Sequence, residues 1–332
     1  MLKLSEIVAP IQPQLARVDE ILNQTVFNSN HDGLKKVHQD VLEIPGKRLR
    51  PALFLLCYYS LLAPSLDQVE ALCYTAAAIE LIHMASLVHD DINDKADTRH
   101  NKPSVVATWG QPIAMTMGVY LYAIALDILT HHAPLSVVRE IGLAVKEMCE
   151  GELSQILERN NPELGFDVYM AILDKKTASL FAATCKSAAL FAERDDNLVA
   201  DFDQLGRCFG LGFQISDDYL DFVDLGDHLG KKPGQDFELG EMTLPIFYLL
   251  NDASQSEKVT INHHITSKSS EGFEALRAML SQSSAIEKTR QKAECHLAQA
   301  LTTISSLQSS PYRESLNAVA QGILDRVYVK AT

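Results

Sequence analysis

The chain has 332 residues, of which 47% are hydrophobic and 22% are charged. This composition is ordinary for a soluble globular protein and excludes a disordered chain. Its 29 lysines and arginines stand against 43 aspartates and glutamates, which gives a formal net charge of −14. We therefore expect no nucleic-acid partner, because so acidic a surface binds polyanions poorly.

Apolar residues recur at helical spacing along most of the chain, and alternating strand-like runs are scarce, so we predict an all-α protein. The predicted helices span residues 4–27, 49–63, 67–95, 104–130, 135–159, 166–192, 196–223, 240–251, 273–305 and 311–328. The polar stretch 251–272 is expected to be a mobile surface excursion. No repeat or clear linker divides the sequence, so we expect a single domain over residues 1–332.

The six cysteines form no C-x-x-C pair and lie in apolar or helical-looking stretches, which is typical of buried thiols in a reducing compartment. The amino terminus, MLKLSEIVAP, reaches Glu6 before any long apolar run, so no signal peptide is expected. The longest uncharged apolar run, 112–126, is short for a bilayer span. We expect a cytoplasmic protein without a transmembrane segment, which an apolar substrate can still bring to a membrane.

Two acidic motifs of identical spacing, D-D-x-x-D, follow long apolar helices. They consist of Asp90, Asp91 and Asp94, and of Asp217, Asp218 and Asp221. Residues i and i+4 share a helical face, so the outer two carboxylates of each motif can hold one cation together. Acids are disfavoured at the carboxyl ends of helices, and a bound cation explains their presence better than two solvated helix ends. Ligands that are all oxygen favour Mg²⁺.

Cations gather near these motifs, although the chain as a whole is acidic. They are Lys47, Arg48 and Arg50 at the start of a helix, Arg99 and His100 after the first motif, Lys176 within an apolar helix, and Lys231 and Lys232 after the second motif. Clustered cations of this kind indicate sites for a compact polyanion. Interleaved with two acidic motifs, they indicate diphosphate binding.

Taken together, these motifs resemble those of the trans-isoprenyl diphosphate synthases, the all-α head-to-tail prenyltransferases. The matching segments are GKRLRP (46–51), ELIHMASLVHDDINDKADTR (80–99), GELSQ (151–155), KT (176–177), GFQISDDYLD (212–221) and GKKPGQDFELGEMTLP (230–245). The resemblance implies an isoprenoid-synthase-type bundle of roughly ten or more helices around a central cavity. It also implies a homodimeric trans-prenyltransferase that condenses isopentenyl diphosphate with an allylic diphosphate by Mg²⁺-dependent ionisation and releases diphosphate.

The resemblance also assigns roles to individual residues. Three Mg²⁺ ions would be held by Asp90, Asp91, Asp94, Asp217 and Asp218, with Asp221 as a support acting through water. Lys176, Lys231 and Arg99 would contact the allylic diphosphate, and Lys47, Arg50 and His83 would hold the diphosphate of isopentenyl diphosphate. Thr177 and Gln214 would stabilise the carbocation by their dipoles, which makes Lys176, Thr177, Gln214 and Lys231 the candidate catalytic residues.

Three positions depart from the family pattern. His100 stands in place of the second of two paired arginines, and it can still donate a hydrogen bond to a diphosphate. Val119 follows Gly118 where an aspartate is frequent, and Glu241 replaces a lysine that many members have near the allylic site. We expect these changes to affect the level of catalytic activity and the substrate preference rather than the type of reaction.

Product length depends on the residues five and four positions before the first aspartate, where bulky side chains close the product tunnel of the family. These positions hold Ala85 and Ser86, both small. We therefore expect a medium-to-long polyprenyl diphosphate. The alternative is a deeper floor formed by Ile82, Met115 or Met117, which would stop growth near geranylgeranyl diphosphate and make the protein a geranylgeranyl or farnesyl diphosphate synthase.

Other classes of protein fit fewer of these residues. The pair His89-Asp90 also occurs in helical metal-dependent phosphohydrolases, and Glu80-x-x-His83 resembles half of a di-iron site whose second half is absent. A terpene cyclase would leave the predicted cations for a second diphosphate without a ligand. A non-catalytic subunit of a heteromeric synthase is the remaining alternative, although such subunits usually lose the aspartate motifs.

Overall fold

The computed structural model describes residues 4–27, 31–44, 46–223 and 234–328. In chain order the elements are α1 (Leu4–Ile7), the 3₁₀ helix η1 (Ala9–Ile11), α2 (Gln12–Phe27), α3 (Asp32–Leu42), α4 (Leu49–Leu61), α5 (Leu66–Asn93), β1 (Thr98–Arg99), β2 (Lys102–Pro103), α6 (Val105–Trp109), α7 (Gln111–His132), α8 (Leu135–Leu157), α9 (Phe166–Leu173), the π-helical turn η2 (Asp174–Ala178), α10 (Ser179–Phe191), α11 (Asp196–Phe222), α12 (Gln235–Leu239), α13 (Leu244–Asp252), α14 (Gln255–Ser267), α15 (Ser270–Ser281), α16 (Ala285–Ser306) and α17 (Pro311–Arg326). The two short strands form an antiparallel hairpin. The all-α prediction is therefore confirmed.

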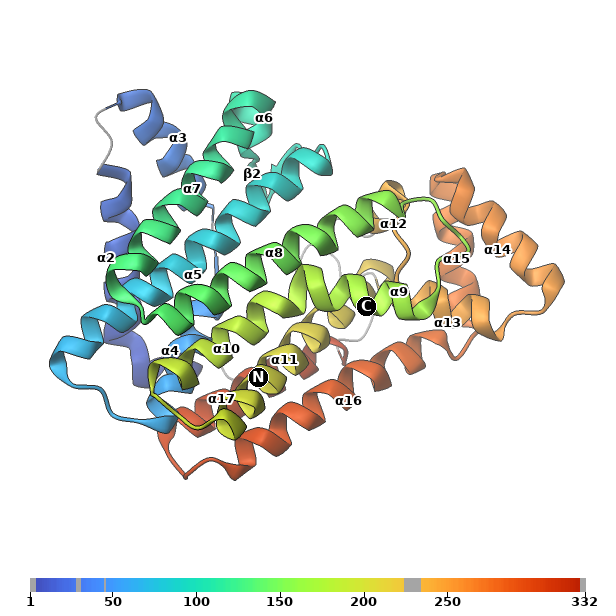
Figure 1. Ribbon diagram of the computed structural model, residues 1–332. Helices are drawn as coiled ribbons and strands as arrows, with labels where there is room; N and C mark the ends of the chain where they lie inside the picture. Colours follow the sequence, from blue (N-terminus) through green and yellow to red (C-terminus); the bar gives the residue numbers. More distant parts are fainter. Residues whose placement is uncertain (1–3, 28–30, 45, 224–233, 329–332) are drawn as a thin grey trace.

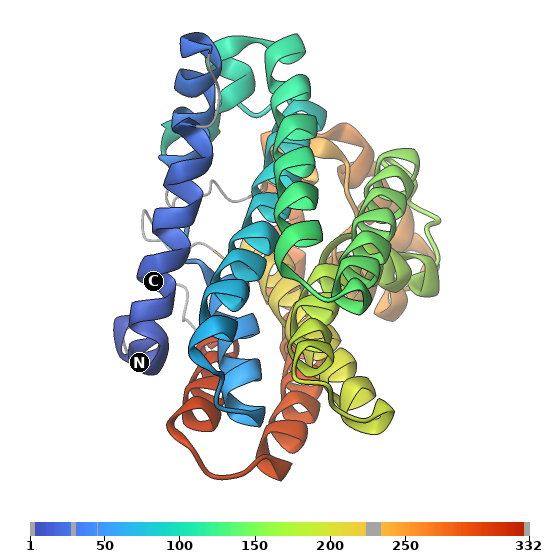
Figure 2. The same ribbon diagram turned by 60° about the vertical axis from the view of Figure 1, so that its left-hand side comes forward.

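The long helices pack into a bundle (Figure 1). Among the described residues it contains two buried apolar clusters, and α11 and α16 contribute to both of them. The larger cluster includes Phe202 and Phe209 of α11, whereas the smaller one includes Ile215 from the same helix. Figures 1 and 2 show α2 and α3 on one side of the bundle and α14 and α15 on the other. Helix α11 therefore crosses from one cluster to the other just before its acidic motif.

Helix α5 is the central helix that leads to the first acidic motif. It begins with a capping box in which Ser65 and Gln68 satisfy each other's backbone N–H groups. From Leu72 to Ile82 every side chain except that of Tyr74 is buried, so the helix has almost no polar face over this stretch. A helix of this kind belongs to the inside of a bundle, and the buried stretch leads directly to the acidic carboxyl end of the helix.

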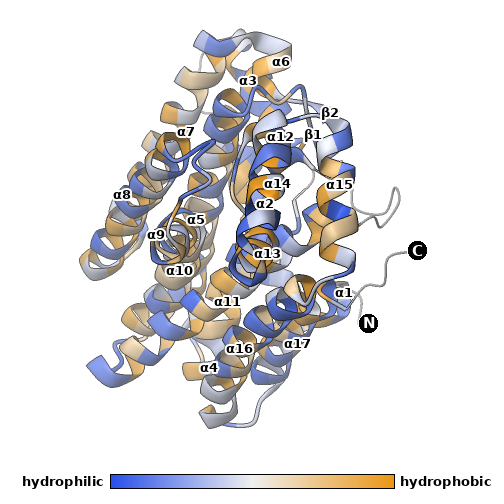
Figure 3. Ribbon diagram, turned by 90° about the vertical axis from the view of Figure 1, so that its right-hand side faces the viewer, coloured by the Kyte–Doolittle hydropathy of each residue, from blue (hydrophilic) through white to orange (hydrophobic). Residues whose placement is uncertain are grey.

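In the part of the chain that the structure describes, two helices, α5 and α7, are long and apolar enough to cross a membrane by length and composition alone. In α5, 72% of the most apolar window is buried inside the protein, as in a core helix of a soluble protein, but in α7 only 39% is buried. Ile113, Met115, Val119 and Leu126 of α7 carry much of the exposed apolar surface. Hydrophobic segments of α7 and α8 are visible at the edge of the bundle (Figure 3).

No helix was predicted within residues 252–272, and this was wrong. These residues contain the whole of α14 and the start of α15. Ser254 and Glu257 make a capping box at the start of α14, and the buried side chains of Ile261 and Ile265 attach the helix to the smaller cluster. The polar residues between these anchors are the solvent face of an amphipathic helix.

Other differences concern where helices break. The predicted helix 273–305 is two helices, α15 and α16, separated by residues 282–284. The predicted helix 104–130 breaks at Gly110, whose φ of 80° lies in the left-handed region that favours glycine. Helix α3 was not predicted at all.

The prediction that every cysteine is buried was partly wrong. Four of the six cysteines are buried, but Cys149 and Cys295 are exposed. Both exposed residues lie on helices that also present a solvent face, α8 and α16. An apolar neighbourhood in the sequence therefore did not determine which side of the helix each thiol occupies.

Candidate active site

The first acidic motif lies at the carboxyl end of α5 and is held by arginines from two other segments. Asp91 is buried and accepts hydrogen bonds from Nε and Nη2 of Arg99, the first of these at 2.9 Å. Asp94 accepts one from Nη2 of Arg159 at 2.5 Å. Burial raises the pKa of Asp90 to about 7, although the nearby Lys176 opposes this rise. The motif is thus a set of carboxylates balanced by fixed cations.

The second motif lies near the end of α11. Asp217 is half-buried and pairs with Arg326. The guanidinium carbon of Arg326 also lies 4.3 Å from the centre of the Phe213 ring. Asp218 is buried, and its Oδ2 accepts hydrogen bonds from the Tyr169 hydroxyl and from a backbone N–H at 3.0 Å. Asp221 is buried and accepts the backbone N–H of Gly234 at 3.2 Å. The three acids of this motif thus have three different environments.

Lys176 lies near Asp90 of the first motif, in the π-helical turn η2. Its Nζ is 2.6 Å from Oε2 of Glu152 on α8. Although burial alone would lower the pKa of Lys176, the nearby carboxylates, chiefly those of Asp90 and Glu152, raise it above its ordinary value. The ammonium group therefore stays charged, and single π-turns inside helices are frequent at functional sites.

The next residue, Thr177, connects this turn to the second motif. Its hydroxyl donates to Oε1 of Gln214 at 2.9 Å, and Nε2 of Gln214 donates to Oδ1 of Asp218 at 3.2 Å. Burial, and then the charge of Asp236, raises the pKa of Asp218 to about 7. One helical turn therefore interacts with both acidic motifs. The sequence predicted these site residues, but it did not predict the hydrogen bonds between them.

The predicted cations for the second diphosphate gather around His83. Burial lowers the pKa of His83 well below its ordinary value, and the charges of Arg50 and Arg99 lower it further. The Arg50 guanidinium carbon lies 4.4 Å from the centre of the Phe181 ring, and its buried Nε has no hydrogen-bond partner among the described residues. His100 belongs to the same group, because Arg99 and the exposed Lys47 both lower its pKa in addition to the effect of burial. A cluster of cations around a neutral imidazole is suited to an anion.

Arg48 forms ion pairs with two carboxylates. Its guanidinium donates to Asp19 at 2.9 Å and to the buried Glu80 at 3.1 Å. Glu80 is therefore the partner of an arginine, which disfavours the di-iron alternative. The phosphohydrolase alternative gains no support either, because a ring nitrogen of His89 lies 3.2 Å from the carbonyl oxygen of Met115, on the neighbouring helix α7.

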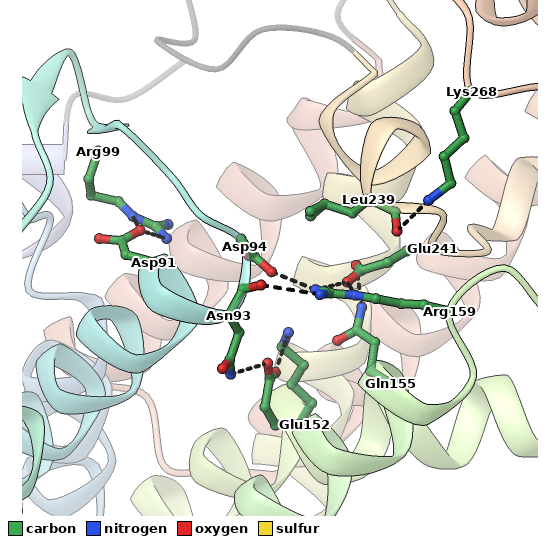
Figure 4. A network of polar contacts seen from close by, with 11 residues as sticks. Asp91, Asn93, Asp94, Arg99, Glu152, Gln155, Arg159, Leu239, Glu241 and Lys268 are labelled. Atoms are coloured by element: carbon green, nitrogen blue, oxygen red, sulfur yellow. Dashed lines mark hydrogen bonds and ion pairs between the residues drawn. The ribbon is translucent and has the colours of Figure 1, made fainter. Parts of the chain in front are cut away.

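Glu241, one of the departures from the family pattern, lies in a network of polar contacts (Figure 4). Its Oε1 accepts hydrogen bonds from Nε and Nη2 of Arg159 at 2.9 and 2.6 Å, and its Oε2 accepts one from Nε2 of Gln155. Arg159 thus joins Glu241 to Asp94. Sequence reasoning missed Arg159, Glu152, Tyr169 and Arg326. Of these only Glu152 carried a signal, because it lies inside the segment GELSQ.

The donor set of the acidic motifs fits Mg²⁺. Among the residues that the structure describes, no three His, Cys, Asp or Glu side chains lie close enough to hold one ion without help. Mg²⁺ keeps several waters and binds through one or two carboxylates together with the phosphates of a substrate. Asp90 and Asp94, one helical turn apart on α5, supply such a pair.

The remaining predicted residues differ in how well they are placed. Lys231 lies outside the described residues. Ala85 is fully buried, and Ser86 is half-buried, with its hydroxyl donating to the His83 carbonyl oxygen at 2.8 Å. Of the alternative floor residues, Ile82 and Met117 are buried, whereas Met115 is 52% exposed.

Comparisons with known proteins agree with one another. The polyprenyl synthetase family model matches residues 31–282. An all-trans-nonaprenyl-diphosphate synthase (geranyl-diphosphate specific) of Rhodobacter capsulatus is 30% identical over 97% of this chain and 98% of its own length. Heptaprenyl diphosphate synthase component 2 of Bacillus subtilis is 33% identical over 94% of this chain and 87% of its own. The crystal structure of a Caulobacter crescentus polyprenyl synthase, complexed with calcium and isoprenyl diphosphate, has a TM-score of 0.90 at 25% identity and covers 97% of each chain.

Proposed function

Because the chain belongs to the polyprenyl synthetase family and is a prenyltransferase of the polyprenyl diphosphate synthase type, we propose that it makes a medium-to-long-chain all-trans polyprenyl diphosphate. It does so by condensing isopentenyl diphosphate with an allylic diphosphate. The main support is the turn η2. Lys176 in this turn is a neighbour of Asp90, while Thr177 is linked through Gln214 to Asp218. An allylic diphosphate between the motifs would meet all of these groups.

Each group of residues has its own task in this proposal. Asp90, Asp91 and Asp94 of the first motif and Asp217 and Asp218 of the second would hold Mg²⁺ against the allylic diphosphate, and Asp221 would support them through water. Bound Mg²⁺ neutralises the diphosphate and so favours its departure. Lys176 and Lys231 bind the same diphosphate, and Arg99 contributes a further positive charge. Thr177 and Gln214 present their oxygen dipoles to the allylic cation.

The second substrate binds at the cation cluster around His83. Arg50, with its unpaired buried N–H, and Lys47 and His100 hold the diphosphate of isopentenyl diphosphate. Its double bond then attacks the allylic carbon, and a proton leaves to the departing diphosphate. Water must be excluded, since it would convert the cation to an alcohol.

Two observations support a product longer than geranylgeranyl. The side chains at Ala85 and Ser86 are small, and the relatives in Rhodobacter capsulatus and Bacillus subtilis are described as nonaprenyl and heptaprenyl synthases. Ile82 and Met117, both buried, are the residues that would form the deeper floor in the shorter-chain alternative.

We also propose that a second copy of the chain covers the exposed apolar face of α7. Met115, Val119 and Leu126 recur on one face of this helix, at spacings of four and seven residues, and are 52% to 58% exposed. Apolar stripes of this kind are typical of interfaces. The Bacillus subtilis relative is named as one component of a synthase. The purified chain should therefore be assayed for activity on its own, and its mass in solution should be measured.

One experiment tests the function and separates its alternatives. The purified chain is incubated with isotope-labelled isopentenyl diphosphate, Mg²⁺ and geranyl, farnesyl or geranylgeranyl diphosphate in turn, and the products are sized by mass spectrometry. Products longer than geranylgeranyl support the proposal, and growth that stops at geranylgeranyl supports the shorter-chain alternative. Cyclised products from an allylic diphosphate alone would indicate a terpene cyclase. A folded protein that forms no product with any primer would contradict a catalytic role and favour a non-catalytic subunit.

A further inference from the structure

Arg159 follows the carboxyl end of α8 and lies between two carboxylates from different parts of the chain (Figure 4). Its Nη2 is 2.5 Å from Oδ1 of Asp94 and 2.6 Å from Oε1 of Glu241, and its Nη1 is 3.3 Å from the carbonyl oxygen of Asn93. The Arg159 side chain is only 15% exposed. The guanidinium group thus occupies an oxygen of Asp94, a carboxylate that the proposed function assigns to a metal ion.

Glu241 gives Arg159 a second anchor that does not depend on Asp94. The Arg159 Nε also donates to Glu241, at 2.9 Å, and Gln155 fixes the other oxygen of that carboxylate. The backbone on either side is joined as well, because the N–H of Asn160 donates to the carbonyl oxygen of Gly240 at 2.8 Å. If Asp94 turned away, Arg159 would remain in place, held by Glu241, and one N–H of its Nη2 would lose its acceptor.

We propose that Arg159 is a displaceable counter-ion: it neutralises Asp94 when no metal is bound and passes to a diphosphate oxygen when Mg²⁺ takes Asp94, while Glu241 keeps it in position. This inference rests on the proposed function of the acidic motifs. A divalent cation and a guanidinium group repel each other when both approach one carboxylate. A diphosphate that arrives with the metal removes this conflict, since it supplies acceptors for the N–H group that Asp94 releases.

The proposal gives Arg159 opposite effects on two ligands. Bound alone, Mg²⁺ competes with the guanidinium group, so Arg159→Gln should raise the affinity for Mg²⁺ by at least about threefold. Bound with Mg²⁺, inorganic pyrophosphate gains a contact from Arg159, so the same variant should lower the affinity for pyrophosphate by about tenfold. Both affinities are measured by isothermal titration calorimetry on the full chain, the second at saturating Mg²⁺.

Matched variants separate this role from general charge and from support of the fold. Arg139→Gln removes the same charge from an exposed position on α8 and should change neither affinity. A residue that only joined α8 to the segment before α13 would lower the melting temperature when replaced, without raising the affinity for Mg²⁺. Equal or weaker Mg²⁺ binding by a folded Arg159→Gln variant would therefore overturn the proposal.

A double variant covers the case in which Arg159→Gln alone folds poorly. The double variant Arg159→Gln/Glu241→Gln replaces the charged Arg159–Glu241 pair with two amides of similar shape. This is far less costly than leaving one charge of that pair buried and unpaired. The local charge is then unchanged, so Mg²⁺ affinity should stay near the wild-type value while pyrophosphate affinity falls. Unchanged pyrophosphate affinity would contradict the proposal.

The same measurements show which of the two proposals fails. Wild-type protein that makes polyprenyl products, together with an Arg159→Gln variant that binds both ligands like wild type, refutes the counter-ion role and leaves the function intact. Wild-type protein that binds neither Mg²⁺ nor pyrophosphate refutes the proposed function itself.

Discussion

The Tyr169 hydroxyl on α9 donates a hydrogen bond to Oδ2 of Asp218 on α11, and the same oxygen accepts the backbone N–H of Leu244. Asp218 is thus hydrogen-bonded by residues of two other helices, α9 and α13. Because burial already raises the pKa of Asp218 to about 7, donors to its carboxylate are what keep the charged form accessible near neutral pH.

Tyr169→Phe removes one of these donors. We expect the variant to lose about 1–3 kcal/mol of unfolding free energy, since a buried acceptor loses a partner. The pKa of Asp218 should rise further, so the acidic limb of the pH–activity profile should move to higher pH. Diphosphate release measured across pH at saturating Mg²⁺ checks this, with Tyr248→Phe, a half-buried tyrosine of α13, as the control. An acidic limb at the wild-type position would mean that Asp218 does not limit activity.

Asp90→Asn tests the first acidic motif without changing the size of the side chain. It removes a charge that the proposal assigns to holding Mg²⁺ against the diphosphate, so condensation should fall by at least about 100-fold. The measurement is Mg²⁺-dependent diphosphate release. Asp201→Asn, an exposed position on α11, should keep wild-type activity. Full activity in Asp90→Asn would remove Asp90 from the metal site.

Ala85→Phe tests the placement of the product tunnel. A phenyl ring at this buried position should shorten the longest product rather than abolish condensation, because it lies one turn or more before the reacting centre. The product distribution is measured by mass spectrometry with each primer. Overpacking is expected to cost about 1–3 kcal/mol of stability, so the melting temperature is measured in parallel. Ala278→Phe, exposed on α15, should leave the distribution unchanged, and unchanged product length in Ala85→Phe would refute the placement.

The sequence predicted what depends on local spacing and missed what depends on packing between helices. The spacing predicted that each motif lies at the end of a long helix, and the first motif does end α5 while the second lies near the end of α11. Arg159 was missed because its partners, Asp94 and Glu241, are 65 and 82 residues away in the chain. Nothing in the polar segment around Arg159 distinguishes it from an arginine on a solvated surface.

The misplaced helix boundaries have a related cause. Helix α14 is attached to the fold by two buried isoleucines, Ile261 and Ile265, within a segment whose average polarity suggests a loop. Two apolar residues one turn apart are a weak periodic signal, and the rest of the stabilisation comes from tertiary contacts that the sequence does not display.

His38 gives a prediction about stability that is independent of the active site. Burial lowers the pKa of its imidazole from 6.5 to about 4. Below pH 6.5 the unfolded chain takes up a proton that the folded protein does not, so the unfolding free energy should fall as the pH drops from 6.5 to about 4, by up to about 3 kcal/mol. His38→Gln retains a partner for the Thr25 hydroxyl but does not titrate. Denaturant unfolding of both proteins at several pH values should show the stability of wild type falling relative to the variant below pH 6.5; parallel curves would contradict the assignment.

Gly151 and Gly142 lie on the same helix, α8, and should respond to alanine in opposite directions. A Cβ at Gly151 would lie 2.4 Å from the backbone nitrogen of Lys176, whereas a Cβ at Gly142 has nothing within 4 Å. Gly151→Ala must therefore push the turn η2 away from α8, which should cost about 1–3 kcal/mol of stability and lower condensation, because Lys176 and Thr177 move with the turn.

Gly142→Ala should instead stabilise the protein by about 0.5–1 kcal/mol, since alanine is the better helix former, and leave activity unchanged. Unfolding free energies and rates of diphosphate release for the two variants give the comparison. If Gly151→Ala kept wild-type activity despite lower stability, a displaced η2 would still support condensation, and the position of Lys176 beside Asp90 would not be what activates the allylic diphosphate.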